Sequence, residues 1–374
     1  ALLCRLQSLA GLVALDSGLG QDRNGRYDII SALPTLLLTE TLEQADMFAR
    51  VQQALDQERP EQPLPDAFLA LPFNGGALGY FAYDGSANIC LDANVQAPRE
   101  FELATAFESN LSPVQYASAF ERIQDYIQAG DCYQVNLAQR FASRYTGDPL
   151  SAYLRLRSSI HSPFAGFMRT DKGAVLSFSP ERFIRVHDHQ VLTQPIKGTR
   201  PRSKDAVQDQ ALARELQQSG KDRAENLMIV DLLRNDLGTI CTTGSIKVEQ
   251  LFELHSFTNV HHLISSIRAR LAPEHTAMDL LRNCFPGGSI TGAPKKRAME
   301  IIAEIEPDSR QVYCGTLGYM GFDGNLDSNI MIRTLHCTQG EIYCWGGGGI
   351  VADSICAQEY QECFDKINNI INKL

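Results

Sequence analysis

Hydrophobic residues recur at helical spacing in the stretch 112–131. Apolar side chains three or four residues apart form one face of a helix, so this stretch is predicted to be helical. Ser112 before Pro113 is a suitable N-cap, and Gly130 is a suitable stop. The apolar positions are Tyr116, Phe120, Ile123 and Ile127.

The same spacing predicts a closing helix at about 357–374, and residues 205–237 are predicted to form one or two helices. Runs rich in β-branched and aromatic residues, several of them alternating, predict strands between these helices. The predicted strands are Cys132–Phe141, Phe164–Arg169, Ala174–Phe178, Phe183–Val186 and Val191–Ile196.

The first third of the chain is less regular. It contains a helical stretch at Leu42–Leu55, a Pro- and Glu-rich loop at 57–65 and a Gly-rich turn entering a strand at 73–84. Residues 84–110 lack the strand pattern of their surroundings. Because no Pro/Ser linker divides the chain, we expect one interwoven α+β domain over 1–374, with 1–110 as an N-terminal subregion and 111–374 as the core.

Composition narrows the class of protein. The chain has 374 residues, 44% of them hydrophobic, and a net charge of −10. An acidic chain of this kind is not expected to bind nucleic acid, and no apolar run is long enough to span a membrane. The short apolar start predicts a buried element rather than a signal peptide. The scattered cysteines are typical of a protein kept reduced in the cytoplasm.

Lys197 lies in the segment TQPIKGTRPR, where the predicted strand gives way to a turn. Alternation places it on one face with Thr193 and Pro195. A lysine between Ile196 and Gly198 can be partly desolvated and can act as a nucleophile. Alternatively, it is an edge lysine that prevents strand pairing. The local pattern leaves both interpretations open.

Glu181 and Glu225 are the first two candidate functional carboxylates. Glu181 follows a proline at the end of a predicted strand, where burial would make it a general acid; the alternative is a surface ion pair with Arg182 or Arg185. Glu225 shares a helical face with apolar residues, so it should be either functional or paired in a buried ion pair.

Glu362 is a third candidate, on the closing helix. It shares a face with Glu359 and Lys366. A solvated Glu362–Lys366 pair is one interpretation. The other is that Glu362 and Glu225 together hold Mg²⁺, which favours two carboxylates plus waters and substrate oxygens.

Two glycine-rich segments, 284–300 and 344–354, can bring backbone N–H groups close to an anion, although either can also be a plain turn. The spacing GxxxxGK[ST] is absent from the first, which argues against a nucleotide site. Arg333 could bind a carboxylate through its two-pronged guanidinium.

These segments together, in this order, resemble the chorismate-utilising enzyme family. The resemblance extends from about residue 112 to the end and more weakly into the N-terminal part. It rests on PIKGTRPR, SPERF, KDRAENLMIVDLLRNDLG, VHHL, CFPGGSITGAPKKRAMEII, GYMGFDGNLDSNIMIRT, GGGIVADS and EYQECFDKIN, with FNGGALGYFAYD, ALDSG and RYDII near the start. Residues 84–107 are shorter than the family's pattern.

The resemblance implies a fold of two large antiparallel β-sheets packed together, with helices on the outside. It also implies chorismate as the substrate, Mg²⁺ as the cofactor, and ammonia supplied by a separate glutaminase subunit. Glu225 and Glu362 match the metal-binding positions, Glu181 the catalytic acid/base, and Ser17, beside Asp16, a tryptophan-binding element. The positions expected to bind substrate are Gln134, Gly198, His262, Thr291, Arg333, Gly347, Gly348 and Lys366.

Lys197 distinguishes the branches of the family. Its segment reads PIKGT, whereas anthranilate synthase typically has PIAGT. The lysine therefore favours the branch that makes 4-amino-4-deoxychorismate for folate synthesis through a covalent lysine intermediate, with anthranilate synthase as the alternative. Isochorismate and salicylate synthases place a water-activating lysine where this chain has Gln134. A catalytically dead regulatory module would have lost Glu181, Glu225 or Glu362, and all three are present.

Overall fold

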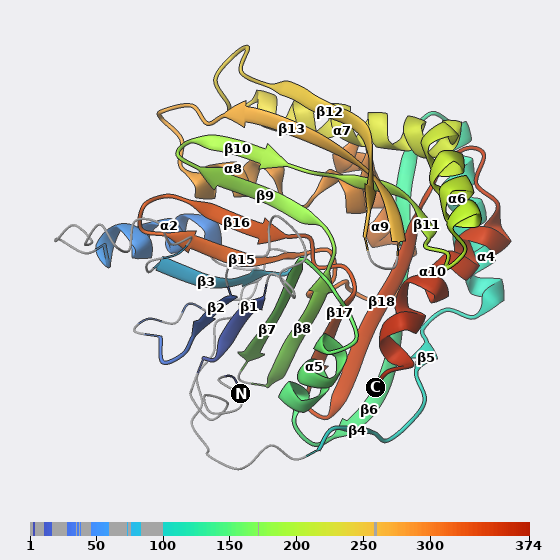
Figure 1. Cartoon of the computed structure of the whole chain (residues 1–374), viewed down its shortest axis with the longest axis horizontal. Helices are drawn as coiled ribbons and strands as arrows, with labels where there is room; N and C mark the ends of the chain where they lie inside the picture. Colours follow the sequence, from blue (N-terminus) through green and yellow to red (C-terminus); the bar gives the residue numbers. More distant parts are fainter. Residues whose placement is uncertain are drawn as a thin grey trace.

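The computed structural model describes residues 3, 11–16, 28–34, 36, 38, 46–59, 73, 76–83, 100–170, 172–257 and 260–374. These residues form two large antiparallel β-sheets with helices around them, as the family resemblance predicted (Figure 1). In the described part of the chain, no helix has the length and apolar character needed to span a membrane. The described cysteines are all free, and most of them are buried.

The larger sheet has ten strands, two of which, β4 (Glu102–Leu103) and β5 (Glu108–Ser109), flank one edge. The other strands lie in the spatial order β14 (Gly292–Ala293), β6 (Gln134–Thr146), β18 (Glu341–Ile350), β17 (Thr334–Thr338), β8 (Gly173–Ser179), β7 (Phe164–Thr170), β1 (Val13–Asp16) and β2 (Asp28–Ser31).

The second sheet has eight strands. Their order is β11 (Ile196–Pro201), β13 (Val260–Arg270), β10 (Gln190–Thr193), β9 (Arg182–His187), β16 (Leu326–Asn329), β15 (Thr316–Gly321) and β3 (Gly76–Phe81), with β12 (Lys247–Ser256) also paired to β13. Strands from the first 110 residues therefore extend both sheets.

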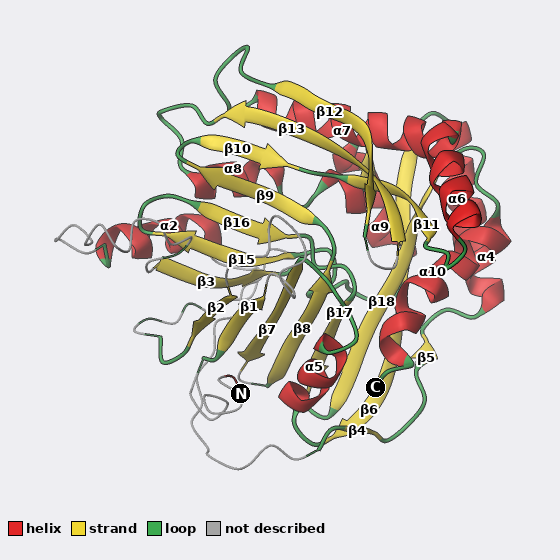
Figure 2. Cartoon of the chain, viewed as in Figure 1, coloured by secondary structure: helices red, strands yellow, loops and turns green. Residues whose placement is uncertain are grey.

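The helices cover the outer surfaces and ends of the sheets (Figure 2). Helix α10 contacts β18, α9 contacts β6, and α7 contacts β11 and β13. The helices are α2 (Met47–Gln57), α4 (Pro113–Gln128), α5 (Pro149–Arg157), α6 (Ala206–Gln218), α7 (Gly220–Gly238), α8 (Ala277–Cys284), α9 (Lys295–Ile305), α10 (Cys356–Ile371) and the short 3₁₀ helix η1 (Gly288–Ile290).

Strands β7 and β8 show why their sequences are almost continuously apolar. Met168 and Val175 belong to the core that joins the two sheets, whereas their neighbours Phe167 and Leu176 belong to the core beneath α5 and α10. Successive side chains of a strand point to opposite faces, so a strand covered on both faces needs apolar residues throughout.

The helix predicted from 112–131 forms as α4, and Ser112 and Gln115 make a reciprocal capping box at its start. Residues 205–237 form two helices, α6 and α7, with Ser219 between them. The strand predicted at Val191–Ile196 is wrong in its extent. Strand β10 ends at Thr193, and the chain re-enters the sheet at Ile196 as β11, because Pro195 has no N–H for the ladder.

Candidate active site

Lys197 lies inside strand β11 and not at a strand-to-turn transition, which corrects the sequence prediction. Strand β11 pairs with β13 alone among the described strands, so the lysine is on an edge strand. A register shift between Lys197 and Thr199, with Gly198 at φ +84°, interrupts the ladder at this point. The lysine Nζ lies 3.4 Å from the carbonyl oxygen of Ser289. Its side chain is thus directed toward the turn of η1.

Lys197 also lies close enough to all three predicted carboxylates to act on them electrostatically. Its charge acts to lower the pKa of Glu181, of Glu225 and of Glu362, although these residues come from three different parts of the chain. A lysine that only protects a sheet edge would point into water. The structure therefore brings together the residues that the sequence selected separately.

Glu181 follows β8 and is only 6% exposed. The Ser289 hydroxyl donates a hydrogen bond of 2.9 Å to its carboxylate. Burial raises the pKa of Glu181 to about 6, against the opposing effects of Ser289 and Lys197. Arg182 instead pairs with Asp327 at 3.0 Å, so it is not the partner of Glu181. This environment suits a group that exchanges protons near neutral pH.

A group of carboxylates separate from Glu181 includes Glu225 on α7 and Glu362 on α10. Lys366 Nζ lies 2.6 Å from Glu362 Oε1, so the predicted helical pair forms. Burial raises the pKa of Glu362, but Lys366, Lys197 and Lys221 outweigh it and the pKa is lowered overall. Burial raises the pKa of Glu225, and the negative charges of Glu359 and Asp222 add to this effect.

Glu359 is a member of this group that the sequence analysis placed on the right face but gave no role. It is 4% exposed, accepts a 2.8 Å hydrogen bond from the Ser354 hydroxyl and lies 3.5 Å from Lys221 Nζ. Its burial is set by the fold and could not be read from the sequence, where Glu359 lies on the polar face of an amphipathic helix.

Gly348 in β18 leaves the space in which these carboxylates meet. A Cβ there would lie 2.9 Å from Glu359 Oε2 and 3.5 Å from Glu362 Oε1. Among the described residues, no three His, Cys, Asp or Glu side chains converge closely enough to ligate an ion alone. The arrangement fits a hard cation such as Mg²⁺, which takes one or two protein carboxylates and fills its shell with water and substrate oxygens.

Arg333 supplies a positive charge that interacts with Glu181. Burial lowers the pKa of its guanidinium, whereas Glu181 acts to raise it. No ion pair within the described residues uses its side chain. Its backbone has φ +51°, a strained region for a non-glycine residue. A buried guanidinium held in this way is suited to a ligand carboxylate.

His262 is 3% exposed, and its Nδ1 lies 2.9 Å from the Thr199 hydroxyl. Burial first, and then the charge of Arg333, lower its pKa to about 4, so the imidazole is neutral at pH 7. Thr291 is fully buried and donates to the carbonyl of Gly287 at 3.0 Å. Gly198 packs so closely that a Cβ would lie 2.8 Å from Leu216.

The four glycines 346–349 form neither a turn nor an anion nest. They lie within β18 and pair with β6, which corrects the sequence interpretation. Their lack of side chains permits close approach: a Cβ on Gly346 would lie 2.2 Å from the carbonyl oxygen of Cys363 in α10. Gly347 offers its own carbonyl to Lys366 Nζ at 2.7 Å.

Gln134 is fully buried at the start of β6, and neither polar atom of its side chain has a hydrogen-bond partner among the described residues. Its amide lies against Gly349. Buried amides are normally paired, so this one is available to a bound molecule.

Ser289 is a second candidate site residue that was not predicted from the sequence. One residue touches both Lys197, through its carbonyl, and Glu181, through its hydroxyl. The turn carrying it is anchored by Arg310, which donates to the carbonyls of Ile290 and Asn136 and pairs with buried Glu306 at 2.6 Å. The two glycines before Ser289 indicated a turn in the sequence, but they did not indicate which side chain of the turn would lie in the site.

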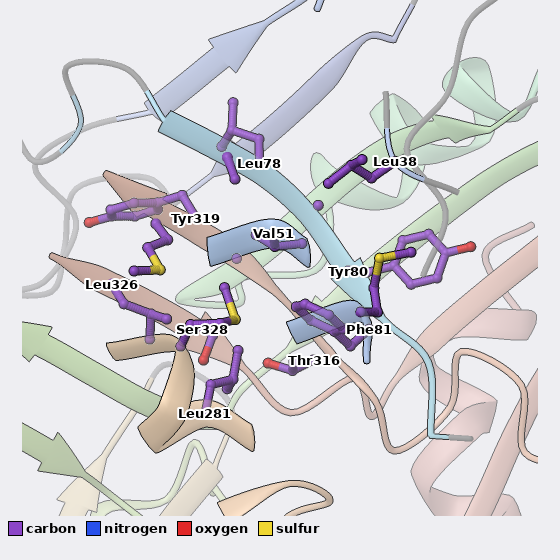
Figure 3. Close-up of a pocket in the computed structure, with 16 residues that line it drawn as sticks. Leu38, Val51, Leu78, Tyr80, Phe81, Leu281, Thr316, Tyr319, Leu326 and Ser328 are labelled. Atoms are coloured by element: carbon purple, nitrogen blue, oxygen red, sulfur yellow. The ribbon is translucent and has the colours of Figure 1, made fainter. Parts of the chain in front are cut away.

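Ser17 lies outside the described residues. Its neighbour Asp16 pairs with Arg157 through two contacts of 2.5 and 2.6 Å. An apolar pocket of about 40 Å³ lies between α2, α8 and strands β3, β15 and β16 (Figure 3). It has room for a few waters, and its lining holds no acidic or basic side chain. None of the candidate site residues lines this pocket.

Comparison with known proteins gives consistent findings. A family model described as chorismate binding enzyme matches residues 82–372. Aminodeoxychorismate synthase component 1 of Klebsiella aerogenes is 43% identical, with 99% of this chain and 95% of that protein covered. The Escherichia coli K12 protein of the same name is 42% identical, with 99% and 94% covered. The crystal structure of anthranilate synthase component I from Streptococcus pneumoniae TIGR4 has a TM-score of 0.76 at 28% identity, covering 97% of this chain and 91% of that one.

Proposed function

The chain belongs to the chorismate-binding enzymes, and we propose that it is an aminodeoxychorismate synthase component 1, which converts chorismate and ammonia to 4-amino-4-deoxychorismate. Identity of 43% and 42% to two proteins of that name over almost the whole chain supports this assignment. The observation that carries the chemistry is the position of Lys197, which lies close enough to Glu181, Glu225 and Glu362 to act on all three electrostatically.

Chorismate carries two carboxylates, and we propose a different group of residues for each. Arg333, with no ion pair in the described part of the chain, would bind the enolpyruvyl carboxylate through its guanidinium. Glu225 and Glu362 would hold Mg²⁺, with Glu359 beside them. When bound, the ion neutralises the ring carboxylate and fixes the ring in position. The proposed Mg²⁺ position is bordered by Lys366 and Gly348, which lie next to Glu362, and by Gly347, whose carbonyl contacts Lys366.

Lys197 would attack ring C2 as the free amine. Both ring double bonds shift, from C1–C2 to C1–C6 and from C5–C6 to C4–C5, and the C4 hydroxyl leaves as water after receiving a proton from Glu181. Ammonia then attacks C4, both double bonds shift back, and the Lys197 amine is expelled. One difficult displacement becomes two easier ones. A pKa of about 6 leaves Glu181 about one tenth protonated at pH 7, enough for a general acid that also returns as a base.

The ammonia is proposed to come from a second component, a glutaminase subunit. The name "component 1" of the relatives implies such a partner for them. Ammonia is mostly protonated at neutral pH, so its direct release next to the site would raise the local concentration of the reactive base.

The covalent role of Lys197 is tested by incubating the enzyme with chorismate and Mg²⁺ without ammonia and measuring the intact mass. We expect an adduct in the wild type and none in Lys197→Ala, whose kcat should fall by roughly 10³-fold or more. Absence of the adduct together with full activity of Lys197→Ala would refute the covalent role.

Product analysis separates the assignment from anthranilate synthase. With chorismate, Mg²⁺ and ammonium, we expect a product that a separate lyase converts to 4-aminobenzoate. Appearance of a fluorescent product with release of pyruvate would instead identify anthranilate synthase.

A further inference from the structure

Strands β9 and β10 are neighbours in the second sheet, and the chain continues from β10 into β11 (Figure 1). Glu181 directly precedes β9, and Lys197 is the second residue of β11. The ladder between β9 and β10 ends at Arg185 and Leu192, before either of these residues is reached. The position of Glu181 relative to Lys197 is therefore not fixed by this ladder.

Side-chain hydrogen bonds join the two segments beyond the end of the ladder. Thr193 Oγ1 donates to the carbonyl of Phe183 at 2.7 Å. Arg182 Nη1 donates to Gln194 Oε1 at 2.8 Å. The second bond reaches the last residue before Pro195, which has no N–H for the ladder. We call this bond the Arg182–Gln194 clamp.

Arg182 is fixed by other contacts on its remaining sides. It is 5% exposed, and its Nε and Nη2 donate to the Asp327 carboxylate at 3.0 and 3.2 Å. Its guanidinium lies over the ring of Phe164, 4.8 Å from the ring centroid. Because the guanidinium is planar, holding one edge on a carboxylate sets the direction of Nη1 toward Gln194.

Gln194 is fixed from the opposite side by strand β13. Its Nε2 donates to the Ser266 hydroxyl at 3.2 Å, and this hydroxyl donates to Gln250 of β12 at 3.1 Å. The amide therefore has one partner for its oxygen and another for its nitrogen. The chain is held at this point by side chains, directly before the break at Pro195.

The segment that Gln194 holds brings two groups to the site. The backbone N–H of Ile196 hydrogen-bonds the Glu181 carboxylate. The next residue is Lys197, whose Nζ lies 3.4 Å from the carbonyl of Ser289. The Ser289 hydroxyl in turn donates to Glu181. A displacement of this segment would therefore change the placement of the amine relative to the acid.

We propose that Arg182 and Gln194 are positioning residues, which set the placement of Lys197 relative to Glu181. This rests on the proposed function. Arg182 directly follows Glu181, and Gln194 is three residues before Lys197, so the clamp joins the two backbone segments that carry the reacting groups. A displacement of about 1 Å between reacting groups can lower a rate by about 100-fold. Substrate binding depends less on the clamp, because Arg333 belongs to another segment.

Gln194→Met tests the clamp. Methionine has nearly the length of glutamine, but its thioether is only a weak acceptor for the Arg182 guanidinium. With chorismate, Mg²⁺ and ammonium, we expect kcat to fall about tenfold or more and the KM for chorismate to stay within about twofold. Formation of the Lys197 adduct without ammonia should slow as well. Steady-state turnover and time-resolved intact mass measure these effects.

Arg182→Lys tests the other side of the clamp. A lysine keeps a positive charge for Asp327, but it lacks the planar fork that holds Asp327 and Gln194 together. We expect a loss of kcat similar to that of Gln194→Met and little further loss in the double variant, because both substitutions break one contact. A double variant whose loss is the product of the two single losses would contradict the clamp.

Ser328→Ala is the matched control. Its hydroxyl donates to the Ile184 carbonyl of β9 at 3.2 Å, so its removal weakens the same sheet without changing the clamp. We expect kcat within about twofold of wild type, with thermal unfolding used to compare the stability of all variants. An equal fall of kcat in Ser328→Ala would assign the loss to a weakened sheet and contradict the clamp.

The outcomes separate this proposal from the proposed function. A wild type that makes no 4-amino-4-deoxychorismate from ammonium contradicts the function and, with it, a positioning role in that reaction. A wild type that makes it, combined with wild-type kcat in a folded Gln194→Met, contradicts the clamp alone. A higher KM for chorismate with unchanged kcat would make Gln194 a binding residue, which also contradicts the positioning role.

Discussion

Glu181 and Glu362 are the same amino acid in two environments with opposite consequences. Glu181 is buried beside one hydroxyl, and burial raises its pKa to about 6. Glu362 is 48% exposed and stands beside Lys366, and the surrounding lysines hold its pKa below the usual range. The first carboxylate can exchange a proton at neutral pH, whereas the second stays charged and can hold a cation.

The comparison shows that burial and the neighbouring charges determine which carboxylate of this site can be protonated at neutral pH and which stays charged. Lys197 and Lys366 act to lower the pKa of both carboxylates, but only Glu362 is in direct contact with Lys366, at 2.6 Å, and Lys221 adds a third cation there. In the proposed mechanism, proton transfer would therefore take place at Glu181 and charge neutralisation at Glu362.

The largest effect is expected for Glu181→Gln. The amide keeps the shape and the contact with Ser289 but cannot donate the proton, so kcat should fall by about 10²–10⁴-fold. The KM for chorismate should change little. Steady-state turnover and adduct formation without ammonia measure this, and a kcat within a few-fold of wild type would show that Glu181 is not the acid.

Glu362→Gln should act on metal affinity instead. Loss of one charged ligand should raise the Mg²⁺ concentration needed for half-maximal turnover by about 10–100-fold, and excess Mg²⁺ should restore much of the rate. A Mg²⁺ titration at fixed pH is the measurement. Near-normal turnover and Mg²⁺ dependence would leave Glu362 as a solvated helix residue paired with Lys366.

Ser289→Ala should move the pH profile. The Ser289 hydroxyl lowers the pKa of Glu181, so its removal raises that pKa further above about 6. Because the acid must be protonated to act, the limb on which kcat/KM falls with rising pH should move upward by about one unit, the value of one hydrogen bond to a charged group.

The matched control for this shift is Ser354→Ala, which removes a hydroxyl from Glu359 in the other group. It should alter the Mg²⁺ requirement and leave that limb in place. A limb that stays at the wild-type pH in Ser289→Ala would show that Ser289 does not set the protonation of Glu181.

The smallest effect is expected for Gly348→Ala. The added methyl group would press on Glu359 and Glu362, so Mg²⁺ affinity should fall several-fold while the pH profile stays unchanged. Gly238→Ala is the control, because a Cβ there meets nothing within 4 Å. Equal Mg²⁺ dependence in both variants would place the cation away from Gly348.

Local sequence pattern predicted the elements whose signals are local. The capping box of α4 and the apolar strands β7 and β8 follow from neighbouring residues alone. The straight course of 346–349 was misjudged, because it is decided by pairing with the distant strand β6. The break at Pro195 has a local cause, the missing N–H of proline, and could have been predicted from the sequence. A run of glycines permits a turn, but it equally permits a strand against which a helix packs closely.

The site was predicted from motif resemblance and not from physics at each position. Lys197 taken alone was compatible with an edge lysine, and it does lie on an edge strand. Its orientation toward Ser289, 92 residues away, could not be read from the local sequence. Ser289 and Glu359 were missed for the same reason: their importance lies in contacts with residues far away along the chain.

The buried pair of Arg310 and Glu306 fixes the turn of Ser289 to strand β6. Arg310 holds Ile290 and Asn136, and Glu306 accepts from the backbone N–H of Ala138, so the turn and strand β6 share one anchor. Opening the turn would take the Ile290 carbonyl away from Arg310 and leave part of a buried guanidinium without an acceptor, at a cost of about 1.5–3 kcal/mol. Local fraying of the turn is therefore opposed by a side chain that is itself fixed to strand β6 through the Asn136 carbonyl. The position of Ser289 is thereby tied to the sheet.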